Sequence, residues 1–288
     1  MIAITGAAGK TGRAVTSALS RRGLPVRALV HCAKQMPAAH AAGAVSAQPI
    51  DVTDTAALAD ALRDVDAVYH IAPNVHPDEL GMGRALIDAA RRAGVGRVVF
   101  HSVLRPQLRA MSHHEAKLRV EEALFVSGLA VTVLQPAPYQ QNVLDAREAI
   151  TRDGDYPVPY RVDAPFAVVD LRDVAEAAAI VLAEEGHVEA VYELAGPESL
   201  TPRQMAGCLS AVLGRSVTAR QVSRQDWQRS AERRGLSQYA VETLLSMFRH
   251  YDAHGLVGNP RVLAGLLGRA PTAFEEFARA SVLAEPQN

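Results

Sequence analysis

The sequence predicts an α/β protein built on a doubly wound parallel sheet, with a smaller, mostly helical C-terminal lobe. Two observations predict this fold. Short apolar runs alternate with helix-like periodic segments as far as residue 136, which is the pattern of a parallel sheet covered by helices on both faces. The chain also begins with an apolar strand that runs through a glycine-rich turn into an apolar helix start, over residues 2–15.

The first turn contains Gly6, Gly9 and Gly12 in the spacing G-x-x-G-x-x-G. A strand, a glycine-rich turn and a helix N-terminus together form the seat of a dinucleotide pyrophosphate. The glycines let backbone N–H groups approach the phosphates, and the helix start adds unpaired donors. An ordinary strand–helix turn is the alternative, but the context favours the cofactor site of a Rossmann-type fold. Further ligands expected from this turn are Lys10, Thr11 and Arg13.

The next elements follow from apolar runs bounded by caps and turn residues. Strands are predicted over 26–30, 66–73, 97–103 and 130–136. Helices are predicted over 55–62, 78–93 and 112–127. Thr53 or Asp54 caps the first of these helices, glycines end the other two, and Ser112 with Glu115 forms an S-x-x-E capping box.

The second half of the chain is predicted to combine short strands with capped helices. The strands span 166–170, 191–194 and 217–222. The helices span 173–184, 202–213, 225–234, 237–253 and 260–267, with a last one capped by Thr272 and Glu275. We therefore expect an NADP-binding Rossmann domain over residues 1–142, with 166–194 returning to its core. The substrate-binding lobe is expected over 143–165 and 195–288.

The choice of cofactor follows from an absence. No Asp or Glu precedes Asp51, although NAD enzymes usually place an acid about 20 residues beyond the glycines to bind the ribose hydroxyls. His31 and Lys34 stand at that place, and Arg13 lies in the first helix. These side chains would attract a 2′-phosphate that a carboxylate would repel. The sequence therefore favours NADP(H) over NAD(H), with solvated basic residues as the alternative.

Composition excludes several classes of function. The chain has 288 residues and a net charge of −1, so it can bury a large core and has no bulk attraction to nucleic acid. No apolar run approaches the ~18 residues of a membrane span, and a strand beginning at Ile2 leaves no room for a signal peptide. Cys32 and Cys208 form no metal-binding spacing. We expect a cytoplasmic protein with reduced thiols that binds a small-molecule substrate and no metal, and that can form a homo-oligomer.

Seven segments spread over nearly the whole chain resemble the NmrA-like family of atypical short-chain dehydrogenases/reductases. They are TGAAGKTG (5–12), DVTD (51–54), HSVL (101–104), HHEAK (113–117), SGLAVTVLQPAPYQQN (127–142), VDLRDVAEAAAIVL (169–182) and YELAGPESLT (192–201). The resemblance implies an NADPH-dependent reductase, since the family reduces quinones, aromatic dyes and plant phenolic ethers. It also allows a catalytically silent regulator that senses NADP.

The resemblance also implies a catalytic group. Short-chain dehydrogenases use a Ser, a Tyr and a Lys four residues after the Tyr. Ser102 and Lys117 match the Ser and Lys positions, but the Tyr position is His113. An imidazole titrates near ~6.5 and can donate a proton at neutral pH, whereas a nearby ammonium and a helix N-terminus favour its neutral form. His113 is thus either the proton donor or a helix-start residue without chemistry. Tyr139 is either a phenol near the nicotinamide or an aromatic that packs the lobe.

Further cofactor contacts are implied at the carboxyl ends of the strands, where ligands of such sheets bind. Asp51 resembles the residue that accepts a hydrogen bond from the adenine amino group. Ala72 and Pro73 resemble the loop that passes the nicotinamide ribose. Val52, Pro136, Tyr139 and Lys117 complete the expected contacts.

Three other histidines are expected to be structural. His70 is expected to be hydrogen-bonded within the sheet, because polar groups buried in a sheet find partners. His101 should point to the sheet face opposite Ser102, because side chains alternate along a strand. His114, one helical step from His113, should face solvent.

Two hypotheses of function remain. In the first, the protein is an oxidoreductase that moves hydride from NADPH to a small organic acceptor. A conjugated or quinone-like acceptor is favoured, because it places the developing charge on a distant, solvent-accessible oxygen and does not need the missing Tyr. In the second, it is a redox sensor that binds NADP(H) and contacts a regulatory protein. The presence of Ser102 and Lys117 favours the enzyme.

Overall fold

The computed structural model describes residues 1–282. Its contacts divide the chain into two compact units, each made of three segments. The first unit comprises Met1–Leu108, His114–Gln135 and Val174–Tyr192. The second comprises Arg109–His113, Pro136–Asp173 and the chain from Glu193 onward.

A seven-stranded sheet with the order β3-β2-β1-β4-β5-β6-β8 forms the centre of the first unit. Every neighbouring pair from β3 to β6 is parallel. This is the strand order of the doubly wound dinucleotide-binding fold, so the predicted fold class is confirmed. The strands are β1 (Ile2–Thr5), β2 (Val26–Val30), β3 (Ser46–Pro49), β4 (Ala67–His70), β5 (Arg97–His101), β6 (Val131–Pro136) and β8 (Ala190–Leu194).

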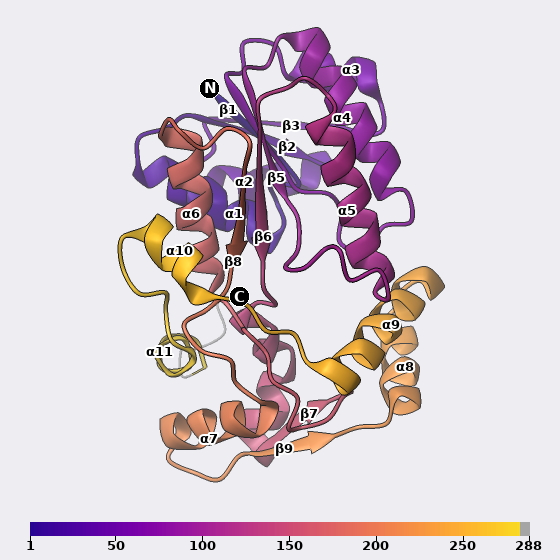
Figure 1. Cartoon of the computed structure of the whole chain (residues 1–288), viewed down its shortest axis with the longest axis vertical. Helices are drawn as coiled ribbons and strands as arrows, with labels where there is room; N and C mark the ends of the chain where they lie inside the picture. The colour runs from indigo at the N-terminus through magenta and orange to yellow at the C-terminus, as the bar shows by residue number, and fades with distance from the viewer. Residues whose placement is uncertain (283–288) are drawn as a thin grey trace. The chain divides into compact units, whose positions relative to one another are not determined.

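Helices cover both faces of this sheet. Figure 1 shows α3, α4 and α5 along one face, and α1, α2 and α6 along the other. Because both faces are covered, β1 and β4 are buried at every residue and consist largely of apolar side chains. The helices are α1 (Lys10–Arg21), α2 (Met36–Ala41), α3 (Thr55–Ala61), α4 (Glu79–Ala93), α5 (Ser112–Phe125) and α6 (Leu171–Ala183).

Several predicted caps are confirmed. The Asp54 carboxylate accepts from the N–H groups of Ala56 and Ala57, which fixes the start of α3. Gly94 ends α4 with φ at 69°, a conformation that a side chain would disfavour. These caps set where each helix begins and ends, and therefore where the loops at the carboxyl ends of the strands emerge.

The strand order of the sheet reverses at β1. The chain leaves β1 toward β2 and β3 on one side and returns to β4 and β5 on the other. Ligands of doubly wound sheets bind where this order reverses, outside the carboxyl ends of the strands. The loops after β1, β2, β3, β4 and β5 therefore position the candidate site.

The second unit contains a small sheet and most of the C-terminal helices. Strand β7 (Asp155–Val158) pairs in parallel with β9 (Thr218–Gln221). Tyr160, Phe166 and Tyr251 form an aromatic cluster with centroid separations of 4.9–5.7 Å. The other elements are a 3-10 segment η2 (Gln140–Ala146), a π-helical turn η3 (Ala149–Asp153), α7 (Pro202–Leu213), α8 (Arg224–Arg233), α9 (Gln238–His254), α10 (Pro260–Leu267) and α11 (Phe274–Ser281).

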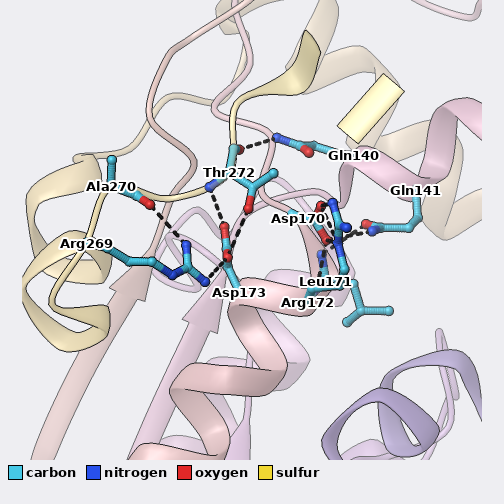
Figure 2. Close-up of polar contacts among 9 residues, drawn as sticks. All are labelled: Gln140, Gln141, Asp170, Leu171, Arg172, Asp173, Arg269, Ala270 and Thr272. Atoms are coloured by element: carbon cyan, nitrogen blue, oxygen red, sulfur yellow. Dashed lines mark hydrogen bonds and ion pairs between the residues drawn. The ribbon is translucent and has the colours of Figure 1, made fainter. Parts of the chain in front are cut away.

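A polar network ties residues 269–272 to the start of α6, as Figure 2 shows. The buried Asp173 carboxylate accepts from the Arg269 guanidinium at 2.7 Å, and from the N–H and the hydroxyl of Thr272 at 2.5 and 3.1 Å. Asp170 accepts from Arg172 and from the Gln141 amide. Each buried carboxylate is therefore paired and hydrogen-bonded, as its burial requires.

Some predicted elements of this half are wrong. Residues 166–170 form single bridges, between Phe166 and Leu200 and between Val169 and Tyr139, and no regular strand. Thr272 does not cap the last helix, because its hydroxyl and N–H bind Asp173; α11 begins at Phe274 with Ala273 as N-cap. The capping box of Thr201 and Gln204 is confirmed. The last residues of the predicted lobe, 283–288, lie outside the described residues.

Among the described residues, no helix combines the length and the apolar character needed to cross a membrane. Within the same part of the chain, no group of three His, Cys, Asp or Glu side chains is placed to hold a metal ion. Cys32 and Cys208 are both free and partly exposed.

Candidate cofactor and active site

The turn between β1 and α1 is tight and depends on its glycines. Gly6 has φ at +63°, and a Cβ on Gly12 would lie 2.4 Å from the Gly6 carbonyl oxygen, so the turn requires glycine at both positions. Gly9 is different: it is exposed, and a Cβ there would lie 3.4 Å from its nearest neighbour. The fold can thus accept a side chain at Gly9. A ligand bound close to the backbone at this position would collide with such a side chain.

The first turn of α1 adds donors and positive charge. Gly9 is the N-cap, and no acidic residue stands in the first turn. Lys10 and Arg13 are exposed, and Thr11 is half-buried. A helix N-terminus offers backbone N–H groups without intrahelical acceptors, which favours an anion such as a pyrophosphate.

The loops after β2 and β3 contain the residues predicted for the adenosine end. His31 and Lys34 are exposed, Lys34 within a short 3-10 turn (Ala33–Gln35). Asp51 is exposed as well, and Val52 is half-buried. Hydrogen bonds from the Thr53 hydroxyl and N–H lower the pKa of Asp51, so this carboxylate stays an acceptor at neutral pH. Strands β1, β2 and β3 are neighbours, so these loops share one edge of the sheet.

The loop after β4 is fixed to β1 by Thr5. The Thr5 hydroxyl donates to the Ile71 carbonyl oxygen at 3.1 Å and accepts from the Ile71 N–H at 2.9 Å. The single hydroxyl proton of Thr5 is given to the Ile71 carbonyl oxygen. Nδ1 of His70, which lies 2.9 Å from the same hydroxyl, is therefore the donor of that contact. The prediction that His70 is bonded within the sheet is confirmed. These bonds hold the start of the segment that continues through Ala72, which is buried, and Pro73, which is exposed.

A buried polar face of α5 lies against the carboxyl end of β5. Lys117 and Glu121 are one helical turn apart and both are nearly inaccessible. The Lys117 ammonium contacts a Glu79 carboxylate oxygen at 2.5 Å and donates to the His101 carbonyl oxygen at 3.0 Å. It also lies 5.1 Å from the centre of the Phe100 ring. These contacts hold the Lys117 ammonium in place, and its catalytic role stays a prediction.

Ser102 is hydrogen-bonded to Glu121. Its hydroxyl donates to Glu121 Oε1, and the Gln135 amide donates to both Glu121 oxygens at 3.0 Å. Burial raises the pKa of Glu121, while the bonds from Ser102 and Gln135 and the charge of Lys117 act in the opposite direction. The structure thus brings Ser102 and Lys117 to the same helix face, each paired with a glutamate.

Two histidines near Lys117 are neutral. Burial, with a smaller contribution from the Lys117 charge, lowers the pKa of His70 and of His101 to about 3. His101 Nδ1 lies 2.6 Å from the Tyr69 hydroxyl. Neither imidazole can therefore act as a protonated acid at neutral pH.

The prediction that His114 faces solvent is wrong. Its side chain is buried, and Nδ1 lies 3.1 Å from the Arg105 carbonyl oxygen, because the loop after β5 folds back over the helix start. His113 is buried in the same first turn, one turn before Lys117 in sequence. His113, Pro136 and Tyr139 belong to the second unit; Tyr139 is half-buried and precedes η2. Their roles stay predictions.

Sequence reasoning missed two residues of this cluster, Glu79 and Glu121. Glu121 could have been found, because it follows Lys117 at i+4, a spacing that places both side chains on one helix face. Glu79 had no comparable indication. It directly follows the N-cap Asp78, where an acid is ordinary, and only the folded chain brings it to Lys117.

Comparisons with known proteins agree with this geometry. The NmrA-like family model matches residues 1–278. An NAD(P)H azoreductase of Xenophilus azovorans is 29% identical over 99% of both chains. A (4-alkanoyl-5-oxo-2,5-dihydrofuran-3-yl)methyl phosphate reductase of Streptomyces griseus is 34% identical over 75% of both chains. The crystal structure of an NADPH-dependent quinone oxidoreductase of Escherichia coli in complex with NADPH is 29% identical. It superposes with a TM-score of 0.85 and covers 97% of this chain and 99% of that one. By its whole-length match, its strand order and its glycine turn, this chain belongs to the NmrA-like family.

Proposed function

We propose that this protein is an NADPH-dependent oxidoreductase that transfers hydride to a small conjugated, quinone-like acceptor. The observation that carries the proposal is the open glycine turn at the N-terminus of α1, next to an acid-free loop after β2. The similarity to an azoreductase and a quinone oxidoreductase over nearly their whole lengths supports a reductase. Bound NADPH would supply the hydride.

In this proposal the first unit binds the cofactor. The amides of the β1–α1 turn, with Lys10 and Thr11, would receive the pyrophosphate, since this helix start offers unpaired donors. Lys34, His31 and Arg13 would bind a 2′-phosphate, which is the basis for preferring NADP(H). Asp51, with Val52, would meet the adenine, and the backbone at Ala72 and Pro73 would pass the nicotinamide ribose.

Lys117 would donate a hydrogen bond to the ribose or to an acceptor oxygen. Ser102 would accept, because its own proton is given to Glu121. His113 and Tyr139 remain the candidates for proton donation, with Pro136 beside the cofactor. The residues of the predicted lobe, 143–165 and 195–288, would contribute the contacts to the acceptor.

The acceptor class follows from the missing Tyr. A simple ketone requires a proton at the oxygen where the charge develops, and His113 stands where that proton donor would be. A quinone carries the charge to an oxygen that water can protonate. A conjugated acceptor is therefore the substrate that this set of side chains serves best.

Stopped-flow NADPH oxidation against a panel of quinones, enones and simple ketones tests the proposal. We expect turnover with quinones, slower turnover with enones and little with ketones. NADH in place of NADPH serves as the control for the cofactor. Tight NADPH binding without reduction of any acceptor would contradict the proposal and favour a sensor of the cofactor's redox state.

A further inference from the structure

Burying the Lys117–Glu79 ion pair costs desolvation free energy, which points to a functional role for the pair. Both side chains are almost completely buried, with 5% and 1% of their surfaces exposed. Removing two charges from water costs several kcal/mol for each ion, and a buried ion pair is often no more stable than apolar residues of the same size. Stability alone therefore gives little reason for an ammonium and a carboxylate in the interior next to Phe100.

Counting donors at Lys117 shows what the pair leaves available. An ammonium has three N–H groups. One of them donates to the His101 carbonyl oxygen, and the ammonium forms a close ion pair with a Glu79 carboxylate oxygen. Among the described residues, no third acceptor is bonded to this nitrogen. The ion pair and the carbonyl bond together hold the ammonium in one place, and Lys117 keeps a donor for a ligand oxygen.

The position of Glu79 in the fold allows it to orient the Lys117 ammonium. It is the first residue of α4, directly after the N-cap Asp78, where the helix N-terminus favours a negative side chain. The segment before it begins at the end of β4 and includes Ala72 and Pro73. Glu79 thus connects the loop after β4 with Lys117 of α5, the two elements to which the proposed function gives the ribose contacts.

We propose that Glu79 is a positioning residue that orients the Lys117 ammonium toward a hydroxyl oxygen of the bound cofactor. This inference rests on the proposed function. The other groups that face Lys117 do not supply the same control. His70 and His101 are neutral, and Glu121 is shared between Ser102 and Gln135.

The test is a double-mutant cycle. Glu79→Gln keeps the shape and removes the charge, Lys117→Met removes the ammonium, and the double variant removes both. We expect Glu79→Gln to lower kcat for quinone reduction by about 10²-fold with little change in the KM for quinone, as a misplaced group does. Glu79→Asp should recover part of the loss. Glu122→Gln, on the exposed side of α5, should keep wild-type kinetics.

The cycle separates positioning from a structural role. If Glu79 acts through Lys117, adding Glu79→Gln to Lys117→Met causes no further loss of kcat. If the kcat loss of the double variant equals the product of the two single losses, the inference is overturned. Wild-type kinetics in Glu79→Gln would overturn it as well. Circular dichroism and thermal unfolding check that each variant is folded. If Glu79→Gln does not fold, the comparison of Glu79→Asp with wild type, with and without Lys117→Met, gives the same decision.

Calorimetric titration with NADPH gives a readout that does not need activity. We expect Glu79→Gln to weaken NADPH binding about 5–10-fold, and only when Lys117 is present, as for loss of one charge-assisted hydrogen bond. If the wild-type protein reduces no acceptor, the proposed function fails while this measurement still decides the inference. A dissociation constant that is unchanged in Glu79→Gln would then overturn it.

Discussion

At the scale of single residues, Lys34 tests the proposed preference for NADP(H) over NAD(H). It is exposed in the turn after β2, where a carboxylate would bind the ribose hydroxyls of NAD. We expect Lys34→Ala to weaken NADPH binding by about 1–2 kcal/mol, the value of a charged hydrogen bond, and to leave NADH nearly unchanged. Calorimetric titration with both cofactors measures this. Arg92→Ala, which removes an exposed cation from α4, is the matched control. Equal losses for NADPH and NADH would refute the assignment.

His113 tests the proposed acceptor class. If the charge of the reduced acceptor reaches solvent, His113→Phe should raise the KM for quinone and keep kcat within about tenfold. Lys117→Ala, in contrast, should lower kcat strongly. Steady-state kinetics of both variants with one quinone provide the comparison. A loss of about 10²-fold or more in kcat for His113→Phe would instead identify the imidazole as the proton donor.

The sequence predicts the residues that act through their backbone or their position in a motif. The glycine turn could be predicted because its spacing is tied to a strand and a helix start, whereas Asp51 and Lys117 were assigned by the resemblance of their segments to the family. Glu79 and Glu121 could not be predicted, since their importance comes from burial against Lys117 and Ser102. His114 was misplaced for a similar reason: the loop that covers it is a feature of the folded chain.

At the scale of elements, the glycines of the β1–α1 turn serve different purposes: Gly12 is required for folding, and Gly9 is expected to be required for cofactor binding. Gly12→Ala would place a Cβ 2.4 Å from the Gly6 oxygen and should destabilise the protein by about 3 kcal/mol. Gly9→Val meets its nearest neighbour at 3.4 Å, so it should cost only about 1 kcal/mol, through the poorer N-cap. Yet it should abolish NADPH binding. Urea unfolding and calorimetry measure the two effects. Normal binding by folded Gly9→Val would place the pyrophosphate elsewhere.

Helices with two capping signals were predicted well, and elements without them were not. α7 carries its capping box and ends at Gly214, and α4 lies between Asp78 and Gly94. β3, with the sequence SAQP, and α2, with MPAAHA, show no clear apolar periodicity. The apolar residues 166–169 are buried. Burial alone does not make a strand, and single bridges to neighbouring segments satisfy part of this backbone.

At the scale of the whole molecule, the chain passes repeatedly between its two units. Val174–Tyr192 belongs to the first unit, although the segments on both sides of it belong to the second. Local sequence contains no marker for such returns, since each helix and strand has the same pattern in either unit. The sequence analysis expects residues 166–194 to return to the core of the Rossmann domain, and these bounds stay a prediction.

The two buried neutral histidines predict how the stability of the molecule depends on pH. The pKa of His70 and of His101 is about 3 in the folded chain, against ~6.5 when unfolded, so the unfolded state binds more protons between these values. The free energy of unfolding should therefore fall as pH drops below ~6.5, by up to about 1.4 kcal/mol per pH unit for each histidine. Glu121, whose pKa is raised, acts in the opposite direction above ~4.5.

Urea unfolding at pH 7, 6 and 5 measures this slope. The double variant His70→Asn and His101→Asn keeps a polar group near each Nδ1 position and removes the titration, so its stability should depend less on pH than that of the wild type. On lowering the pH, the free energy of unfolding should then begin to fall well above the range where exposed carboxylates titrate. The reason is that the buried imidazoles, and not the surface acids, take up the first protons on unfolding. An identical slope in wild type and double variant would show that other groups cause the acid sensitivity.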